Sequence, residues 1–292
     1  MARPTNIDEN NHMKKTTPKK SEDRLKIIEK LKEYEKSGRF DVDVEADPPT
    51  RPLKRGECDY KYKKISSKIG AFFANIAATN FFEKLIKNGQ LVIKEVVGIE
   101  NFSSVKGGAI ITCNHFNPYD NYAVWRVIKP YMKGQKLYKV IREGNYTSFP
   151  GIYGYFFRHC NTLPLSENYE VLKEFLSGVK YHLEKGRKIL IYPEQAMWWN
   201  YRKPRPLKDG AFNIAAKNGV PVLPFFITMT DGKDFTPEGF PVQEYHIFIG
   251  KPIYPDKSLT ARQNVAAMKD KNFAFFKETY ERFYGVLLSY SD

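Results

Sequence analysis

The chain has 292 residues and a formal net charge of +14, from 47 Lys and Arg against 33 Asp and Glu. Residues 1–64 hold 17 basic and 13 acidic residues, and residues 65–292 hold the other 30 and 20, so the excess lies mainly on the later segment. Such a charge favours an anionic partner: nucleic acid, anionic lipid or a phosphorylated small molecule. The composition alone does not indicate which of these three partners the protein binds.

Cysteine content and hydropathy bear on the cellular compartment and on the kind of membrane contact to expect. The three cysteines are too few and too irregularly spaced for a structural zinc site or a disulfide framework, which favours a reducing cytoplasm. No signal-peptide core opens the chain, and no run of 18 uncharged apolar residues occurs. We therefore expect a cytoplasmic protein whose membrane contact, if any, is peripheral.

Residues 1–64 are predicted to form a charged N-terminal extension that is partly disordered and partly helical. Residues 1–20 are polar and typical of disorder. A narrow apolar stripe at helical spacing predicts a short helix over residues 22–37. Residues 39–60 contain three prolines and indicate an extended linker.

Residues 65–88 predict an amphipathic helix at the start of the main domain, residues 65–292. Its apolar side chains recur at steps of three and four residues, with Phe72 and Phe73 on one side and lysines nearby. Such a helix either lies in a lipid interface or packs on the core. Both interpretations stay open at the level of sequence.

From residue 91 onward, predicted strands alternate with predicted helices. Strands are expected over residues 91–97, 109–113, 136–141, 160–165, 188–192, 222–228 and 245–249, and helices over 119–130, 168–185, 211–218 and 260–289. This alternation predicts an α/β domain with a partly parallel sheet.

The segment Ile110–Asp120 combines a histidine and a carboxylate at a strand end. A buried strand runs into Asn114 and His115, and Asn117 and Pro118 suit the start of the next helix. Because His115 precedes the helix, the chain can fold Asp120 back onto the imidazole. A carboxylate there holds the ring and stabilises the imidazolium that forms when Nε2 takes a proton from an alcohol. A lone His-x4-Asp pattern is more often structural, but α/β folds place their sites at strand ends.

No protein nucleophile accompanies this pair. The sequence has no Gly-x-Ser-x-Gly elbow, and Cys113 lies within the predicted strand, where a thiol usually packs in the core. A base without a nucleophile implies that the substrate supplies one. A substrate hydroxyl that attacks an activated acyl group fits this pattern.

A second segment, residues 188–218, also runs from a buried strand into a loop. Pro193 and Glu194 follow the strand, and then come aromatic residues interleaved with four cations: Arg202, Lys203, Arg205 and Lys208. The helix predicted after this loop offers free amide donors, so the cations beside it are candidates to clamp an anion. A solvated basic loop is the plainer interpretation. The aromatic residues also fit a membrane interface or a nucleic-acid surface.

Taken together, four segments in order resemble the motifs of the glycerolipid acyltransferase family, typified by bacterial 1-acylglycerol-3-phosphate acyltransferases. They are Asn114-His115-x4-Asp120, Pro150–Ser166, Pro193-Glu194 after a strand, and Val220–Pro224. The resemblance covers about residues 90–255, the motif-bearing core.

The resemblance implies a mixed, seven-stranded sheet sandwiched by helices and transfer of a fatty acyl group from acyl-CoA or acyl carrier protein to a lipid hydroxyl. His115 would be the general base, Asp120 its orienting partner, and Glu194 and Asn114 part of the site around the acceptor. No metal and no cofactor are expected beyond the acyl donor. The implied partners are a lipid acceptor, a donor (possibly acyl carrier protein) and the membrane surface, with no nucleic acid.

Two departures from the family pattern concern the acceptor. The third motif usually continues Gly-Thr-Arg-Ser after Glu194, and here Gln195-Ala196-Met197-Trp198 follows. The second motif usually ends with an arginine, where this chain has Ser166. Both arginines are associated with the acceptor's phosphate. Either Arg202, Lys203 or Arg205 replaces them, or the acceptor is a glycolipid or another alcohol.

Two rival functions remain. A non-catalytic lipid binder of the same fold would explain the altered third motif, but it would have no need of His115 and Asp120. A nucleic-acid-binding module would explain the +14 charge, yet the basic residues are scattered and match no known nucleic-acid motif.

Overall fold

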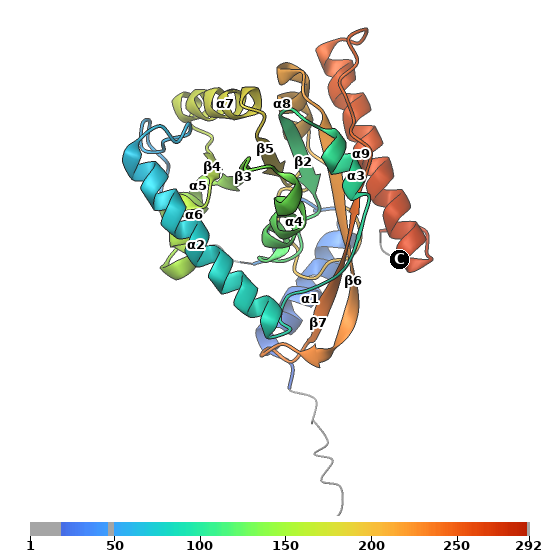
Figure 1. Cartoon of the computed structure of the whole chain (residues 1–292). Coiled ribbons are helices and arrows are strands. Elements are labelled where there is room, and N and C mark those ends of the chain that lie inside the picture. The colour runs from blue at the N-terminus through green and yellow to red at the C-terminus, as the bar shows by residue number, and fades with distance from the viewer. Residues whose placement is uncertain (1–18, 46–49, 291–292) are drawn as a thin grey trace, which may run out of the picture.

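A computed structural model describes residues 19–45 and 50–290. The disorder predicted for residues 1–20 lies, except for its last two residues, outside this described part. Within it, one sheet of seven strands runs through the centre of the molecule in the order β1-β7-β6-β2-β5-β3-β4 (Figure 1). The strands are β1 Val92–Val97, β2 Ala109–Cys113, β3 Leu137–Arg142, β4 Thr162–Leu165, β5 Lys188–Ile191, β6 Val222–Phe235 and β7 Pro241–Ile249.

Only the pair β6–β7 is antiparallel, and the other neighbours are parallel. The predicted mixed α/β sheet is therefore confirmed. The helices around it are α1 Glu22–Lys36, α2 Ile65–Lys87, α3 Ile99–Ser104, α4 Asp120–Ile128, the 3₁₀ turn η1 Lys129–Tyr131, α5 Glu143–Thr147, α6 Gly151–His159, α7 Tyr169–Glu184, α8 Gly210–Asn218 and α9 Ala261–Tyr284.

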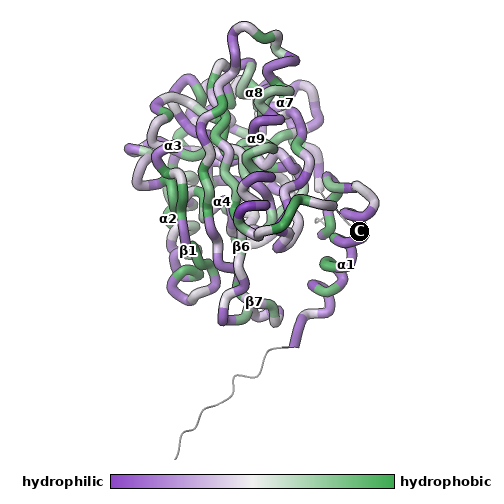
Figure 2. Tube along the Cα trace, turned by 90° about the vertical axis from the view of Figure 1, so that its right-hand side faces the viewer, coloured by the Kyte–Doolittle hydropathy of each residue, from purple (hydrophilic) through white to green (hydrophobic). Residues whose placement is uncertain are grey.

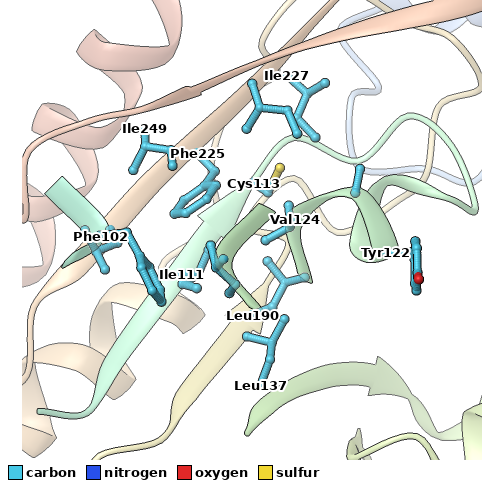
Figure 3. Close-up of a cluster of buried hydrophobic side chains, with 14 of the residues drawn as sticks. Phe102, Ile111, Cys113, Tyr122, Val124, Leu137, Leu190, Phe225, Ile227 and Ile249 are labelled. Carbon is cyan, nitrogen blue, oxygen red and sulfur yellow. The ribbon is translucent and has the colours of Figure 1, made fainter. Parts of the chain in front are cut away.

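Each face of the sheet has its own apolar core. One core joins Phe102 of α3 and Tyr122 and Val124 of α4 to the strand residues Ile111 and Phe225 (Figure 3). The opposite core packs α7, α8 and α9 on the sheet through side chains that include Phe175, Phe212 and Phe276. The strands in the middle of the sheet are buried on both faces, which explains their continuous apolar sequences.

Local signals set several helix ends. Asn168 accepts hydrogen bonds from the backbone N–H groups of Glu170 and Val171 and so caps α7. Thr260 and Gln263 form a capping box that begins α9. The α9 helix ends at Gly285, which has a φ of 68°, so the predicted extension to residue 289 is wrong.

Other elements differ from the prediction for identifiable reasons. The helix α6 was missed because Gly151–His159 holds two glycines and several aromatic residues, which have low helix propensity. β6 continues seven residues beyond Thr228 because the antiparallel partner β7 supplies hydrogen bonds to a polar, largely exposed stretch. The helices predicted over residues 22–37 and 65–88 are confirmed as α1 and α2.

The N-terminal extension packs against the domain over its described length. Leu31 and Tyr34 of α1 and Val44 join Trp198 and Ala196 in a small apolar cluster. Residues 39–45 and 50–64 form no helix or strand, as predicted for a linker, but Leu53 and Tyr60 are buried. Along α1, hydrophobic and hydrophilic positions alternate (Figure 2).

Candidate active site

His115 and Asp120 meet at the carboxyl end of β2, as the sequence predicts. Nδ1 of His115 lies 2.7 Å from Oδ2 of Asp120, the first residue of α4. The same Oδ2 accepts the backbone N–H groups of Phe116 at 3.1 Å and Asn117 at 3.3 Å. Two backbone amides and the imidazole thus converge on one carboxylate oxygen, which fixes the orientation of the His115 ring.

The remaining imidazole nitrogen, Nε2, is the candidate base. The side chain of His115 retains 22% of its exposure, whereas Asp120 is fully buried. Nε2 has no hydrogen-bond partner among the described residues. Asp120 therefore holds the imidazole at Nδ1, while Nε2 has no partner within the described residues. Proton transfer from an alcohol requires such an arrangement.

Tyr192, at the end of β5, also contacts the pair, and the sequence pattern did not single it out. Its ring stacks on the imidazole of His115, with the ring centroids 3.9 Å apart and the planes 15° from parallel. Its hydroxyl donates to Oδ1 of Asp120 at 2.6 Å. Burial, and then the Asp120 carboxylate, raises the pKa of Tyr192 well above its usual range, so the hydroxyl remains a donor. A tyrosine between the buried strand and Pro193 was the only sequence signal for this role.

Glu194, which the resemblance places in the site around the acceptor, is buried beside the main chain of His115. Its carboxylate is 2% exposed and pairs with Arg205, itself 1% exposed, at 2.9 Å. Oε2 of Glu194 also accepts the backbone N–H of His115 at 3.2 Å. The carboxylate thus holds the main chain of His115 instead of a substrate.

The guanidinium of Arg205 is hydrogen-bonded to protein groups. Nε and Nη2 both donate to Glu194, Nη2 also reaches the carbonyls of His115 and Ala196, and Nη1 donates to the carbonyl of Phe40 at 2.8 Å. Each guanidinium nitrogen of Arg205 thus has a protein partner, so this geometry does not support the prediction that Arg205 binds the acceptor. Instead, Arg205 joins the N-terminal extension to the backbone of His115.

The other predicted acceptor ligands also have protein partners. Arg202 donates to Asp231 at 2.6 Å and Lys203 to Glu35 at 2.6 Å, and both side chains stay partly exposed. Asn114 is buried and exchanges two hydrogen bonds of 2.9 Å with the backbone of Ile227, so it ties β2 to β6. A role in acceptor binding stays a prediction for Arg202 and Lys203 and lacks geometric support for Asn114.

Cys113 packs in the core, as expected for a thiol within the strand. It is fully buried, and burial raises the pKa of its thiol well above the usual range. Asn117 differs slightly from its predicted role: its Oδ1 accepts the N–H of Tyr119 at 3.0 Å, which shapes the turn before α4 without capping the helix itself.

The helix α2 exposes the apolar stripe that the sequence placed on one side. Ile69, Phe72 and Phe73 are more than half exposed, while Ala71, Ala74 and Phe82 face the domain. The lysines at positions 61, 63, 64 and 68 lie at and just before its amino end. Packing on the core is thus wrong for this stripe. In the described part of the chain, no helix has the length and apolarity to cross a membrane.

The sequence and structure can be set beside known proteins. Residues 94–228 match the model of a family described as Acyltransferase. A chloroplastic 1-acyl-sn-glycerol-3-phosphate acyltransferase of Brassica napus, BAT2, is 30% identical over 173 residues, which cover 56% of this chain and 46% of that protein. The chain thus spans about half the length of this curated relative. The 1-acyl-sn-glycerophosphate acyltransferase PlsC from Thermotoga maritima is 21% identical with a TM-score of 0.48, over 76% of this chain and 81% of that one.

Proposed function

Because residues 94–228 match the Acyltransferase family model, we propose that this chain is an O-acyltransferase of the glycerolipid type that acts on a lipid hydroxyl at a membrane surface. The donor would be acyl-CoA or acyl carrier protein, and the acceptor a lysophospholipid or glycolipid. The observation that carries the proposal is the 2.7 Å contact between His115 and a fully buried Asp120, with Nε2 left open.

The proposed reaction needs no protein nucleophile. Nε2 of His115 takes the proton of the acceptor hydroxyl as its oxygen attacks the thioester carbonyl. The tetrahedral intermediate collapses, the carbon–sulfur bond breaks, and the leaving thiolate takes the proton back from the imidazolium. Asp120 stabilises the imidazolium during these steps, and Tyr192 holds the second oxygen of Asp120.

Replacement of the base tests this proposal. We expect His115→Ala to lower acyl transfer by roughly 10²–10⁴-fold while the circular dichroism spectrum is unchanged, because a general base is worth about that factor. A matched control is His246→Ala, which removes a histidine that pairs with Glu95 at 3.2 Å across β7 and β1. Undiminished transfer by His115→Ala would contradict the assignment. Release of thiol from acyl-CoA only when a lysolipid is present would exclude the non-catalytic binder.

The membrane part of the proposal rests on α2. A helix that exposes Phe72 and Phe73 beside lysines combines apolar insertion with attraction to anionic lipid. We expect Phe72→Asp with Phe73→Asp to reduce co-sedimentation with anionic vesicles. The pair Val286→Asp and Leu287→Asp adds the same charge at exposed apolar positions beyond α9 and should bind as the wild type does. Equal binding by both double variants would remove the role of α2.

The nucleic-acid alternative was based on the net charge of +14 and on the aromatic and basic loop after Glu194. In the structure each of the four cations of that loop makes an ion pair with a carboxylate, which weakens the second of these two grounds.

A further inference from the structure

The cations that flank the candidate site are balanced one for one by carboxylates. Each of the four cations in the loop after β5 has a different acidic partner. The pairs are Arg202–Asp231, Lys203–Glu35, Arg205–Glu194 and Lys208–Asp41. A chain with a net charge of +14 thus presents an electrically neutral set of side chains at this loop.

A fifth pair lies at the same end of the sheet. Arg142 is the last residue of β3, and its guanidinium makes two hydrogen bonds to the carboxylate of Asp43, one of 2.8 Å. β3 pairs with β5 in parallel, with Lys139 level with Leu190, so the carboxyl ends of both strands lie at the same edge of the sheet. This edge also carries His115 and Tyr192, and it is where α/β folds bind their ligands.

Three of the five carboxylates come from one short stretch of the N-terminal extension, residues 35–43. Glu35 pairs with Lys203 at 2.6 Å, Asp41 with Lys208 at 2.7 Å, and Asp43 with Arg142. The hydrogen bond from Lys208 is the main cause that lowers the pKa of Asp41, so this carboxylate is charged at neutral pH. We call residues 35–43 the acidic strap.

The backbone of the strap is anchored beside His115. The carbonyl of Phe40 accepts from Arg205, whose guanidinium also reaches the carbonyl of His115. The carbonyl of Val42 accepts from the indole N–H of Trp198 at 2.9 Å, and the backbone N–H of Trp198 donates to His115 at 3.1 Å. The strap is therefore a fixed part of this site.

We infer that the acidic strap determines acceptor specificity by neutralising the cations that would otherwise attract a phosphate monoester. This inference rests on the proposed acyltransferase function and narrows its acceptor to a lipid alcohol with a zwitterionic or uncharged headgroup. A phosphate monoester carries a charge of about −1.5 to −2 at neutral pH. To use Arg142, Lys203 or Lys208 it must either displace a carboxylate or lie beside one, and both cost the attraction that a lone cation supplies.

The test compares three acceptors that share one acyl chain: monoacylglycerol, lysophosphatidylcholine and lysophosphatidate. They are presented in uncharged detergent micelles, so that surface charge does not change their local concentration. The wild type should show a kcat/KM for lysophosphatidylcholine or monoacylglycerol at least about tenfold above that for lysophosphatidate, a difference of ~1.4 kcal/mol.

Removal of the strap charges should reverse this preference in part. The triple variant Glu35→Gln, Asp41→Asn, Asp43→Asn keeps the shape and hydrogen-bonding capacity of the three side chains. It should raise the relative kcat/KM for lysophosphatidate on the order of tenfold, and high salt should shrink the gain because exposed charges are screened. The control variant Glu184→Gln, Asp270→Asn, Glu278→Gln removes the same charge from exposed positions on α7 and α9 and should leave the ranking unchanged.

Three results overturn the inference: a wild type that prefers lysophosphatidate, a triple variant with an unchanged ranking, or a control variant that shifts the ranking equally. The single variant Asp41→Asn, at an exposed pair, provides the same comparison at smaller size if the triple variant unfolds. Absence of transfer to every acceptor would instead contradict the proposed function. In that case calorimetric binding of a short-chain lysophosphatidate decides the inference: a gain in affinity in the triple variant supports the strap's role, and no gain overturns it.

Discussion

The imidazole ring of His115 and its main chain are held by two regions of different origin. The ring is held by Asp120, five residues away, and by Tyr192 at the end of the neighbouring strand β5. The main chain is held by Glu194, Arg205 and Trp198, of which Arg205 and Trp198 bond to the N-terminal extension. The first region needs two neighbouring strand ends and one helical turn. The second needs segments more than 150 residues apart to pack together.

This difference indicates which parts of the site tolerate change. Hydrogen bonds between near neighbours form wherever the strand–helix turn forms. A buried ion pair that joins two distant segments depends on both segments, and either charge left alone in the interior is costly. We therefore expect variants in the second region to act first on stability and variants at Tyr192 to act first on proton transfer.

The largest effect is expected from Arg205→Met. Loss of the guanidinium leaves the Glu194 carboxylate buried without its counter-charge, which typically costs about 3–5 kcal/mol. Denaturant unfolding should show this loss. The double variant Glu194→Gln, Arg205→Met removes both charges and should be less destabilised than the single variant. Equal loss in both would mean that the ion pair is not what joins the extension to the site.

A moderate effect is expected from Tyr192→Phe. Oδ1 of the buried Asp120 loses its hydroxyl donor, so Asp120 holds the imidazole of His115 less firmly. We expect kcat to decrease about tenfold, since a hydrogen bond to a charged group is worth ~1.5–3 kcal/mol.

The ring stack provides the control for this variant. Phenylalanine keeps the contact with the imidazole, whereas Tyr192→Leu removes it as well. A kcat of Tyr192→Phe equal to that of the wild type would assign the tyrosine to packing alone.

The smallest effect is expected from Gln195→Gly. Gln195 has a φ of 67°, a left-handed conformation that costs an L-residue about 1–2 kcal/mol and glycine little. Because glycine also gains freedom in the unfolded chain, the net stabilisation should be below ~1 kcal/mol, visible as a small rise in the unfolding midpoint. Destabilisation would mean that the Gln195 side chain makes a contact of its own. The resembled family motif has glycine at this position.

The contact between His115 and Asp120 was predictable because its signal is local. Asn114, His115 and Asp120 follow a buried strand directly, and a parallel strand end is where such residues can act. The sheet order was not predictable from the strands themselves, since β7 lies between β1 and β6 only because the β6–β7 hairpin folds back antiparallel. The role of Tyr192 was missed because a tyrosine at a strand end has many possible partners.

By itself, the sequence determined the α/β alternation, the position of His115 and Asp120 at a strand end, and the apolar stripe on α2. These depend on hydrophobic periodicity and on spacings of a few residues, which the chain carries locally. The tertiary structure alone decided which charges meet. From the sequence, Arg205 was a candidate acceptor ligand, but in the fold it is buried against Glu194 and Phe40. Lys203 and Lys208 were candidate anion ligands, but the acidic strap pairs them with Glu35 and Asp41. A charged side chain interacts through space over several ångströms, so its partner is set by the fold and not by its neighbours in sequence.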